Sequence, residues 1–414
     1  MELKYFDNNK YTFDKISCIK DGHFFDPYFK HEDESTLYGF NKKIEEYKYA
    51  NKSLYENYLS KQEIFKNSIK RRGEIKWMRI LDPEYAINKE EKYNNGEDDD
   101  KTILQGNLGN CYFIAYLYIL KEYHYDVFIS LIKEYEVKTG YVEIVFYIEE
   151  NNKRERKIVV VDDFIPFIKE DNKYIPLFSH YKNYKLTNNR VFLLIEKAYA
   201  KINGSYFCID GNKKEHLMYD YMVALTGVDY CEIELSQFIK DYAKENNIEY
   251  ENKDISDIIK DWAPENNIKV LKKLKNISDN NSIFLATHTC FGFPRRNKNE
   301  YGIFYGHMYA YIKGNEENRN GKSEVFFWTY NPQGKNDFEE INHYEFENIN
   351  EENKKGLKNG IIILNFFRFF KSFRKMRYQN RNLVNINYNI NKFISNLDLL
   401  SNLSIYKKKY NRKI

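Results

Sequence analysis

Cysteine is scarce in this chain and is not arranged in pairs. The sequence has five cysteines, and they lie far apart, at Cys18, Cys111, Cys208, Cys231 and Cys290. An odd number without a Cys-x-x-Cys pair argues against a disulfide framework and against a zinc site built from cysteines. We therefore expect a protein of a reducing compartment, and the cytoplasm is the predicted location.

Long hydrophobic runs are also missing. The two longest, CYFIAYLYIL and IIILNFFRFF, have ten residues each, about half of the roughly 20 that a membrane-spanning helix needs. The N-terminal sequence MELKYFDNNK has no apolar segment of the kind found in signal peptides. These absences predict a soluble intracellular protein.

Tryptophan is rare, with three residues, but the other aromatic residues are abundant, with 38 Tyr and 30 Phe. A hydrophobic content of 42% is enough for a substantial core, which argues against a wholly disordered chain. We find no internal repeat. A length of 414 residues fits one large domain or two smaller ones.

The small net charge of +4 conceals an uneven distribution. Residues 366–414 contain twelve Lys or Arg and one acidic residue, so a basic tail follows a mildly acidic body. Such a tail fits either a patch for anionic membranes or nucleic acid, or a solvated segment that balances the acidic body. We expect no nucleic-acid binding and at most a weak contact with anionic membranes.

The order of sequence patterns predicts an α+β fold. Residues 41–70 are charged with sparse apolar positions, as in a surface helix, and residues 189–202 have helical periodicity that ends before Asn203-Gly204. Between them, residues 140–150 and 157–167 are strand-like and flank the polar sequence NNKRER, as in a hairpin. Past Gly211, short aromatic-rich strands dominate. The sequence therefore predicts a helix-rich N-terminal half and a strand-rich C-terminal half.

Two of the C-terminal strands bring a histidine close to an asparagine. GHMYAYI and EVFFWTYNPQG are separated by KGNEENRNGKS, which has the composition of a turn. If Ile312 faces Val325 in an antiparallel hairpin, His307 lies opposite Tyr330 and beside Asn331. Cross-strand neighbours are about 4.5–5.5 Å apart at Cβ. The hairpin therefore predicts contact between His307 and Asn331.

Cys111 stands where a polar loop meets an apolar helix, in TILQGNLGNCYFIAYLYIL. It is either a small core residue or a nucleophile held at a helix N-terminus. A thiol is mostly protonated at neutral pH, and a helix N-terminus and an imidazolium both favour the reactive thiolate. An amide such as Asn331 fixes the orientation of an imidazole such as His307. Gln105 can place an N–H beside the helix start, where an oxyanion would form.

The sequence around Cys111 resembles the active-site segment of the calpain cysteine proteases, Q-G-x-L-G-x-C-[WY]-x-x-A. Further similarities follow in the family's order from Asp21 to Phe373. They are DGHFFDPYF, KWMR, VVVDDFIPF, LLIEKAYAKINGSY, GHMYAY, NPQG and NGIIILNFFRFFKSF.

The resemblance implies a papain-like two-lobe protease core. A helix-rich lobe would span residues 21–211, and a β-rich lobe with a barrel- or sandwich-like sheet would span residues 212–373. Residues 1–20 would be an N-terminal extension and residues 374–414 a basic tail whose removal leaves the core folded. No segment resembles the EF-hand or C2-like domains of larger calpains, so no EF-hand partner domain is expected in this chain.

The resemblance also implies an intracellular cysteine endopeptidase that hydrolyses peptide bonds of protein substrates through a thioester acyl-enzyme. Cys111 would be the nucleophile, His307 the base, Asn331 its orienting partner and Gln105 the oxyanion donor. Gly211 and Gly306 would line the substrate cleft.

Several positions depart from the family pattern. Gln333 replaces the tryptophan of N-P-W-G, and Asn212 replaces the second glycine of the S-G-G substrate loop. Thr102 and Asn189 stand where the family has calcium-binding carboxylates, although Asp337 retains a position of the second calcium site. Because calcium depends on charged carboxylates for affinity, we expect weak calcium binding or none, and we assign no metal ligand.

Two functional hypotheses remain open. The first is an active calpain-type protease. The second is a calpain-like protein without turnover that acts as a binding or regulatory module, which Gln333 and Asn212 favour. A thiol-reactive probe separates the two.

Overall fold

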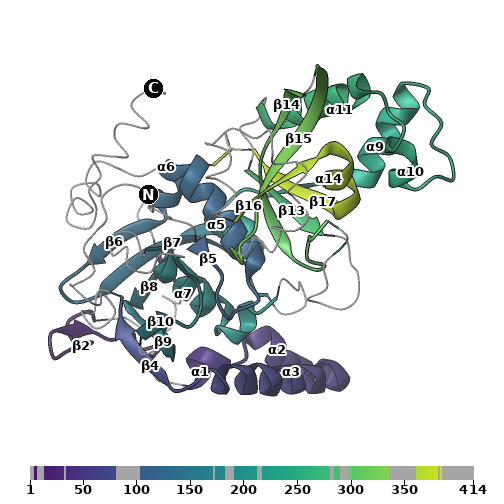
Figure 1. Ribbon diagram of the computed structural model, residues 1–414. Helices are drawn as coiled ribbons and strands as arrows, with labels where there is room; N and C mark the ends of the chain where they lie inside the picture. Colours follow the sequence, from purple (N-terminus) through teal and green to yellow (C-terminus); the bar gives the residue numbers. More distant parts are fainter. Residues whose placement is uncertain are drawn as a thin grey trace.

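The structure of the protein is a computed structural model. It describes residues 4–6, 14–31, 34–80, 103–170, 173–181, 191–211, 217–279, 284–289, 299, 301–319, 321–334, 360–380 and 383–384. Helices and sheets alternate along the chain (Figure 1). Two large hydrophobic cores form, one in each half. The predicted α+β class is confirmed. The papain-like division into two lobes, with its domain limits, stays a prediction.

A four-stranded sheet in the N-terminal half contains the predicted hairpin. Its order is β1 (Lys4–Tyr5), β8 (Lys153–Asp162), β7 (Tyr141–Glu150) and β6 (Ile132–Glu136). The strand β7 agrees closely with its predicted range, but β8 begins four residues earlier than predicted, because only Asn151 and Asn152 form the turn, and the predicted segment beyond Asp162 belongs to β9. Both asparagines have positive φ, 52° and 60°, which asparagine tolerates better than most residues.

Smaller sheets and the surface helices α1 to α3 also belong to the described part of this half. The three-stranded sheet has the order β10 (Lys173–Pro176), β9 (Phe164–Glu170) and β4 (Ile75–Arg79). The two-stranded sheets pair β11 (His180–Tyr181) with β5 (Ile103–Leu104), and β2 (Ile19–Lys20) with β3 (His23–Phe24). The predicted surface helix over 41–70 is a pair of helices, α2 (Lys42–Ala50) and α3 (Lys52–Lys70), and α1 (Glu34–Tyr38) precedes them.

Two buried helices form the centre of the N-terminal core. They are α5 (Cys111–Tyr123) and α7 (Val191–Asn203), and nearly every side chain of both is buried. A helix that is hydrophobic on all sides has to be covered on all sides. The short elements around them are α6 (Tyr125–Ser130), a 3₁₀ turn over Phe207–Ile209, and α8 (Tyr221–Thr226).

The C-terminal half is built on a six-stranded antiparallel sheet. The order is β12 (Cys231–Glu234), β17 (Phe373–Gln379), β13 (Phe284–Thr289), β14 (Met308–Arg319), β15 (Lys322–Tyr330) and β16 (Ile361–Asn365). In the described part of this half, the sheet is accompanied by α9 (Leu235–Glu245), α10 (Ile255–Ile259), α11 (Pro264–Asp279) and α14 (Phe366–Ser372). The predicted contrast between the halves is therefore too sharp, since each half mixes helices with sheet.

The hairpin of β14 and β15 exists, but its predicted register is wrong. Glu316, not Ile312, lies opposite Val325, and Ala310 lies opposite Tyr330. The strands continue through the polar segment read as a turn, because only two residues, with the sequence Asn-Gly, separate Arg319 from Lys322. This dipeptide strongly favours two-residue hairpin loops.

The sheet continues past Phe373, the residue at which the sequence predicts the end of the folded core. β17 lies inside the six-stranded sheet and pairs with both β12 and β13. The side chains of Met376 and Gln379 are buried. Gln379 accepts a hydrogen bond from Tyr116 of α5 and donates one to the Val228 carbonyl. Residues 374–379 are therefore part of the core and not of a tail.

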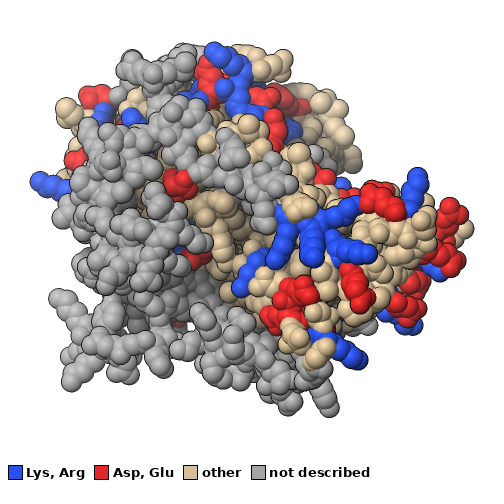
Figure 2. Space-filling model, turned by 90° about the horizontal axis from the view of Figure 1, so that it is seen from above, with Lys and Arg blue, Asp and Glu red and all other residues tan. Residues whose placement is uncertain are grey.

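The basic residues of β17 are paired across the sheet. Arg377 Nε lies 2.8 Å from a carboxylate oxygen of Glu232, and Lys375 Nζ lies 3.0 Å from the other. Arg374 pairs with Glu234 at 3.3 Å. Seen from above, Lys and Arg side chains lie among Asp and Glu side chains over the described surface (Figure 2). Part of the positive charge assigned to the tail is thus neutralised within the sheet.

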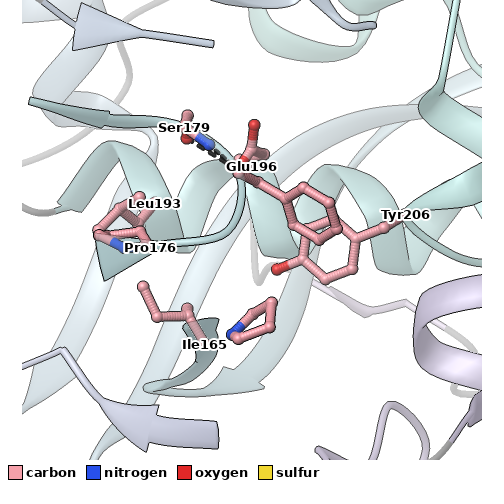
Figure 3. A pocket seen from close by; sticks show the side chains of 8 residues that line it. Ile165, Pro176, Ser179, Leu193, Glu196 and Tyr206 are labelled. Carbon is pink, nitrogen blue, oxygen red and sulfur yellow. Dashed lines mark hydrogen bonds between the residues drawn. The ribbon is translucent and has the colours of Figure 1, made fainter. Parts of the chain in front are cut away.

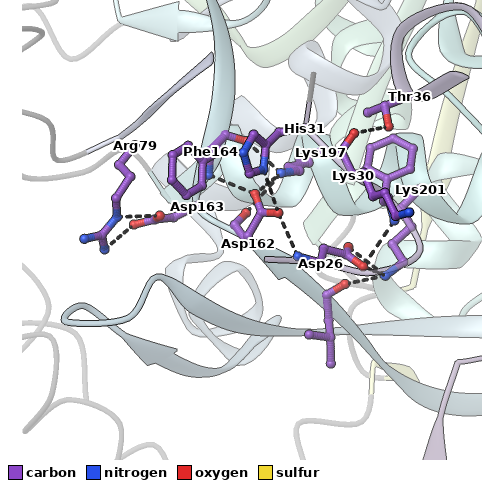
Figure 4. Close-up of polar contacts among 12 residues, drawn as sticks. Asp26, Lys30, His31, Thr36, Arg79, Asp162, Asp163, Phe164, Lys197 and Lys201 are labelled. Atoms are coloured by element: carbon purple, nitrogen blue, oxygen red, sulfur yellow. Dashed lines mark hydrogen bonds and ion pairs between the residues drawn. The ribbon is translucent and has the colours of Figure 1, made fainter. Parts of the chain in front are cut away.

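A buried ion-pair network joins motifs that are far apart in the sequence (Figure 4). Lys197 of α7 pairs with Asp162 at the end of β8, and neither side chain is exposed. Burial by itself raises the pKa of Asp162, but the charges of Lys197 and His31 outweigh burial and hold this pKa below its usual value. Lys201, one turn later, lies 2.8 Å from Asp26. The segments DGHFFDPYF, VVVDDFIPF and LLIEKAYAKINGSY therefore meet in one cluster.

KWMR belongs to the same cluster. Arg79, its last residue, donates two hydrogen bonds of 2.9 Å to the carboxylate of Asp163. Removing one member of a buried ion pair typically costs about 3–5 kcal/mol, because it leaves an unpaired buried charge. These motifs are therefore explained by the packing of the N-terminal core.

Candidate active site

The loop before Cys111 is held in a conformation that only glycine permits at one position. Gly106 has a φ of 61°, and a Cβ there would lie 2.0 Å from the Phe178 carbonyl oxygen. Gly109 donates its N–H to Asp210 Oδ1 at 2.7 Å. The loop thus arrives at α5 in a fixed direction, and Cys111, which is partly exposed, begins the helix.

His307 and Asn331 form the contact that the hairpin predicted. His307 Nε2 lies 2.9 Å from Asn331 Oδ1, and both side chains are buried. The backbone N–H of Gln333 also donates to Asn331 Oδ1, at 3.0 Å. Because that backbone group can only donate, the Asn331 atom facing His307 is oxygen, and His307 must carry its hydrogen on Nε2. The lone pair of Nδ1 is then the basic site of the neutral ring.

The sulfur of Cys111 lies beside this pair. The backbone N–H of Met308, the residue after His307, donates to Cys111 Sγ at 3.3 Å. A hydrogen bond to sulfur favours the charged thiolate over the thiol. The contact arises because α5 packs against β14, which begins at Met308. The structure therefore brings together Cys111, His307 and Asn331 from the two halves of the chain.

Further hydrogen bonds join the loop before Cys111 to the turn after β15. The backbone N–H of Gln105 donates to the Pro332 carbonyl at 3.0 Å, and the Tyr330 hydroxyl donates to the Ile103 carbonyl. Tyr330 also stacks on Tyr118 of α5, with 3.6 Å between ring centroids. These contacts fix the turn that carries Asn331 against the loop that carries Gln105.

Gly334 permits the close approach of the turn to that loop. It has a φ of 64°, and a Cβ there would lie 2.1 Å from Leu104 Cδ2. The adjacent Gln333 is only half-buried.

The side chain of Gln105 is buried near the helix start, but one of its N–H groups is already used. Nε2 donates to the Leu108 carbonyl at 2.9 Å, and Oε1 has no hydrogen-bond partner among the described residues. A primary amide has two N–H groups, so one remains for a substrate oxygen. The role of Gln105 as oxyanion donor stays a prediction.

The two glycines predicted to line the cleft border the same site. Gly211 donates its N–H to the Gly109 carbonyl at 2.9 Å and has open space on its Cβ side. Gly306 directly precedes His307 and has a φ of 65°. Their roles in substrate binding stay predictions.

Aromatic residues surround His307 although Gln333 replaces the family tryptophan. The ring of Tyr309 meets His307 edge-on at 4.9 Å, and that of Phe304 does so at 6.1 Å. Burial lowers the pKa of His307 to about 4, against an opposing effect of the Asn331 hydrogen bond. In the absence of a neighbouring thiolate, His307 is therefore neutral at pH 7.

The buried His307 should make stability depend on pH. Since its pKa is about 4 in the folded protein and about 6.5 in an unfolded chain, the unfolded state binds the proton first as pH falls. The contribution is complete above pH 6.5 and is lost between about pH 6.5 and 4. It amounts to about 3 kcal/mol at 1.36 kcal/mol per pKa unit.

Urea unfolding of the wild type and of His307→Gln at several pH values between 7 and 4.5 measures this contribution. Glutamine can still donate to Asn331 but does not titrate. We expect a distinctly smaller loss of stability in the variant. Parallel pH profiles would contradict a buried neutral His307.

Four positions that bear on calcium or substrate lie outside the described residues. They are Thr102, Asn189, Asn212 and Asp337. Among the residues that the structure does describe, no three His, Cys, Asp or Glu side chains are grouped so that they could hold a metal ion. The expectation of weak calcium binding therefore stays a prediction.

Sequence reasoning missed two contacts of the site. The backbone N–H of Met308 leaves no signal in the sequence, because every residue except proline carries that group. Glu196, which binds the side chain of Asn110, did leave a signal. It is a single acid in the apolar stretch VFLLIEKAYA, where a charge needs a buried partner.

A helix-borne cysteine beside a histidine–asparagine pair is compatible with the site of a cysteine protease. The family model described as "Calpain family cysteine protease" matches residues 43–380, most of the chain. The protein therefore belongs to the calpain family of cysteine proteases. The matched region ends one residue after β17, in agreement with the position of that strand in the sheet.

Curated relatives agree with this family. The chain is 30% identical over 162 residues, 39% of its length, to a calpain-type cysteine protease of Oryza sativa subsp. japonica. It is 30% identical over 141 residues, or 34% of its length, to one of Arabidopsis thaliana, and over 153 residues, or 36%, to one of Zea mays. The matched regions cover only 7%, 6% and 6% of these relatives, respectively.

Proposed function

We propose that the protein is a cysteine endopeptidase that hydrolyses peptide bonds of protein substrates. The observation that carries the proposal is the contact of Cys111 Sγ with the backbone next to His307, while His307 bonds Asn331 at 2.9 Å. A buried thiol with a structural role has no need of a base held in one tautomer. The arrangement has the parts that nucleophilic catalysis requires.

In the proposed mechanism, His307 Nδ1 takes the proton of the Cys111 thiol and the sulfur attacks the substrate carbonyl carbon. The developing oxyanion lies near the backbone N–H of Cys111 and the free N–H of Gln105. His307 then gives its proton to the departing amine, which leaves a thioester on Cys111. Water then attacks the thioester with His307 again as base. The carboxylic acid product is released, and the Cys111 thiol is regenerated.

The proposal includes a reducing environment, with the cytoplasm as the location. Among the described residues, Cys18, Cys111, Cys208 and Cys231 are free thiols. None of the helices in the described part of the chain combines the length and hydropathy needed to cross a bilayer.

A second candidate is a calpain-like binding module without turnover. The observation that favours it is the hydrogen bond from Gln105 Nε2 to the Leu108 carbonyl, which occupies part of the proposed oxyanion donor. Loss of one oxyanion donor typically costs about 10²–10³ in turnover. Such a protein would bind peptides but cleave them very slowly or not at all.

Hydrolysis of casein by the purified chain, in excess chelator and in millimolar calcium, tests the proposal. We expect hydrolysis in both, with at most a small increase in calcium, because Thr102 and Asn189 lack the carboxylates that calcium prefers. Activity only with calcium would show that other acids, such as those of the sequence GEDDDK, bind the ion. No hydrolysis in either condition, with a reactive Cys111, favours the binding module.

A further inference from the structure

Glu196 is a buried acid in the middle of the apolar helix α7. Its Oε1 accepts a hydrogen bond from Asn110 Nδ2 at 2.6 Å, and its Oε2 accepts one from Ser179 Oγ at 2.7 Å. The Ser179 backbone N–H also donates to Oε2, at 3.3 Å. In Figure 3 the side chains of Glu196 and Ser179 point toward each other at the edge of a pocket lined mainly by apolar residues. A buried carboxyl group needs such partners to offset the loss of hydration.

Asn110, the partner of Oε1, is the residue directly before Cys111. Its backbone carbonyl accepts the first hydrogen bonds of α5, from Phe113 at 2.9 Å and Ile114 at 3.1 Å. Its side chain, however, makes no capping bond to the helix, although Asn at this position usually does so. The side chain reaches Glu196 instead, so α7 fixes the peptide unit that leads into the nucleophile.

We propose that Glu196 is a positioning residue for Cys111. Through Asn110 it fixes the first turn of α5 and therefore the place of the sulfur relative to His307. Glu196 does not touch the substrate in this role. The inference rests on the proposed function, because it assigns Glu196 to the same reaction.

The pKa of Glu196 differs from those of the titratable residues near it. Burial raises the pKa of Glu196 to about 7, although the hydrogen bonds from Ser179 and Asn110 lower it. Tyr206 lines the same pocket, and His180 follows Ser179 in the sequence. Burial raises the pKa of Tyr206 far above 10 and lowers that of His180.

The charged neighbour on α7 points elsewhere. Lys197, the next residue, is paired with Asp162. Glu196 is therefore the group in this cluster whose charge changes near neutral pH.

Asn110 can adapt to a neutral partner. Its Oδ1 has no hydrogen-bond partner among the described residues. If the amide turns over, Oδ1 accepts from the amide of a glutamine at position 196 while the glutamine oxygen still accepts from Ser179. Glu196→Gln should therefore keep the link to Asn110 but remove its titration, whereas Glu196→Ala removes the link.

The rate of alkylation of Cys111 by iodoacetamide, measured by mass spectrometry on the full chain, tests the positioning role without requiring peptide turnover. The exposed Cys231 in the same sample is the reference thiol. We expect Glu196→Ala to lower the ratio of the two rates about tenfold at pH 7, because a displaced sulfur loses its contacts near His307. Glu196→Gln should stay within about threefold and lose an inflection near pH 7.

Two further variants separate positioning from general stability. Asn110→Ala removes the link but leaves Glu196 bonded to Ser179, and we expect the same tenfold loss. Ser179→Ala removes a bond of similar length on the other oxygen, and we expect the ratio to stay within about twofold. Equal losses in Ser179→Ala and Asn110→Ala, or an unchanged ratio in Asn110→Ala, would overturn the positioning role.

The same samples distinguish failure of the inference from failure of the proposed function. A wild type that hydrolyses peptides, with unchanged Cys111 reactivity in both Asn110→Ala and Glu196→Ala, overturns the positioning role alone. A wild type without hydrolysis, in which Asn110→Ala still slows alkylation, overturns the protease function and supports the positioning of Cys111.

Discussion

Cys111→Ser should lower peptide hydrolysis by at least about a thousandfold while leaving the fold intact. Loss of a catalytic nucleophile costs about 10⁶-fold in a comparable serine protease, and residual activity comes from binding and oxyanion stabilisation. Serine is nearly isosteric, and Cys111 is only partly buried, so the unfolding temperature should change little. Initial rates on a fluorogenic peptide, with thermal unfolding of the same samples, measure both effects.

Cys231→Ser is the matched control, because Cys231 is exposed on β12 and far along the chain from the site. It should retain wild-type hydrolysis.

His307→Ala should slow alkylation of Cys111 as well as hydrolysis. His288 lies on β13 opposite Met308, so His288→Ala is a close comparison. If His288→Ala abolishes hydrolysis and His307→Ala does not, the assignment of the base is wrong.

Truncation after Phe373 should prevent the C-terminal half from folding. It removes Arg374 to Gln379 of β17, which has partners on both sides in the six-stranded sheet. Met376 and Gln379, with their buried contacts, would be lost at the same time. We expect the truncation to remove more folding free energy than the total stability of a typical domain, which is about 5–15 kcal/mol. Loss of the cooperative unfolding transition in circular dichroism would show it.

A chain that ends after Val384 is the control for this experiment. It keeps every strand of the described sheet and should unfold cooperatively near the wild-type temperature. Cooperative unfolding of the shorter chain at that temperature would contradict the position of β17. Membrane binding by the basic residues can be tested on the control chain, because its sheet is complete.

The sequence predicted the chemistry of the site better than the geometry around it. The predicted register is wrong because the two strands extend through the segment predicted as a turn and because the pairing is irregular between Tyr311 and Lys313. The contact of His307 with Asn331 is nevertheless present. A hairpin prediction fixes which two segments pair, but the register of the pairing depends on the position of the turn. The polar segment KGNEENR gave no sign of its strand conformation, because its side chains alternate little in hydropathy.

The position of β17 could not be predicted for a related reason. FRKMRYQ contains three basic residues and reads as part of the basic tail. Its neighbour β12 supplies Glu232 and Glu234, and these acids come from about 140 residues earlier in the chain. A central strand with charged side chains is stable only when such partners face it. The sequence shows the charges but not their pairing.

The crowding at Gly334 has a consequence for how this protein can change by mutation. Any other residue there would carry a Cβ that overlaps the Leu104 side chain and would adopt a left-handed backbone at a cost of about 1–2 kcal/mol. The displaced Leu104 adjoins Gln105, so one substitution would disturb both sides of the site at once. Gln333, half-exposed and one residue earlier, has no such restriction. In the sequence Asn-Pro-Gln-Gly, neutral substitution is therefore possible at Gln333 but not at Gly334.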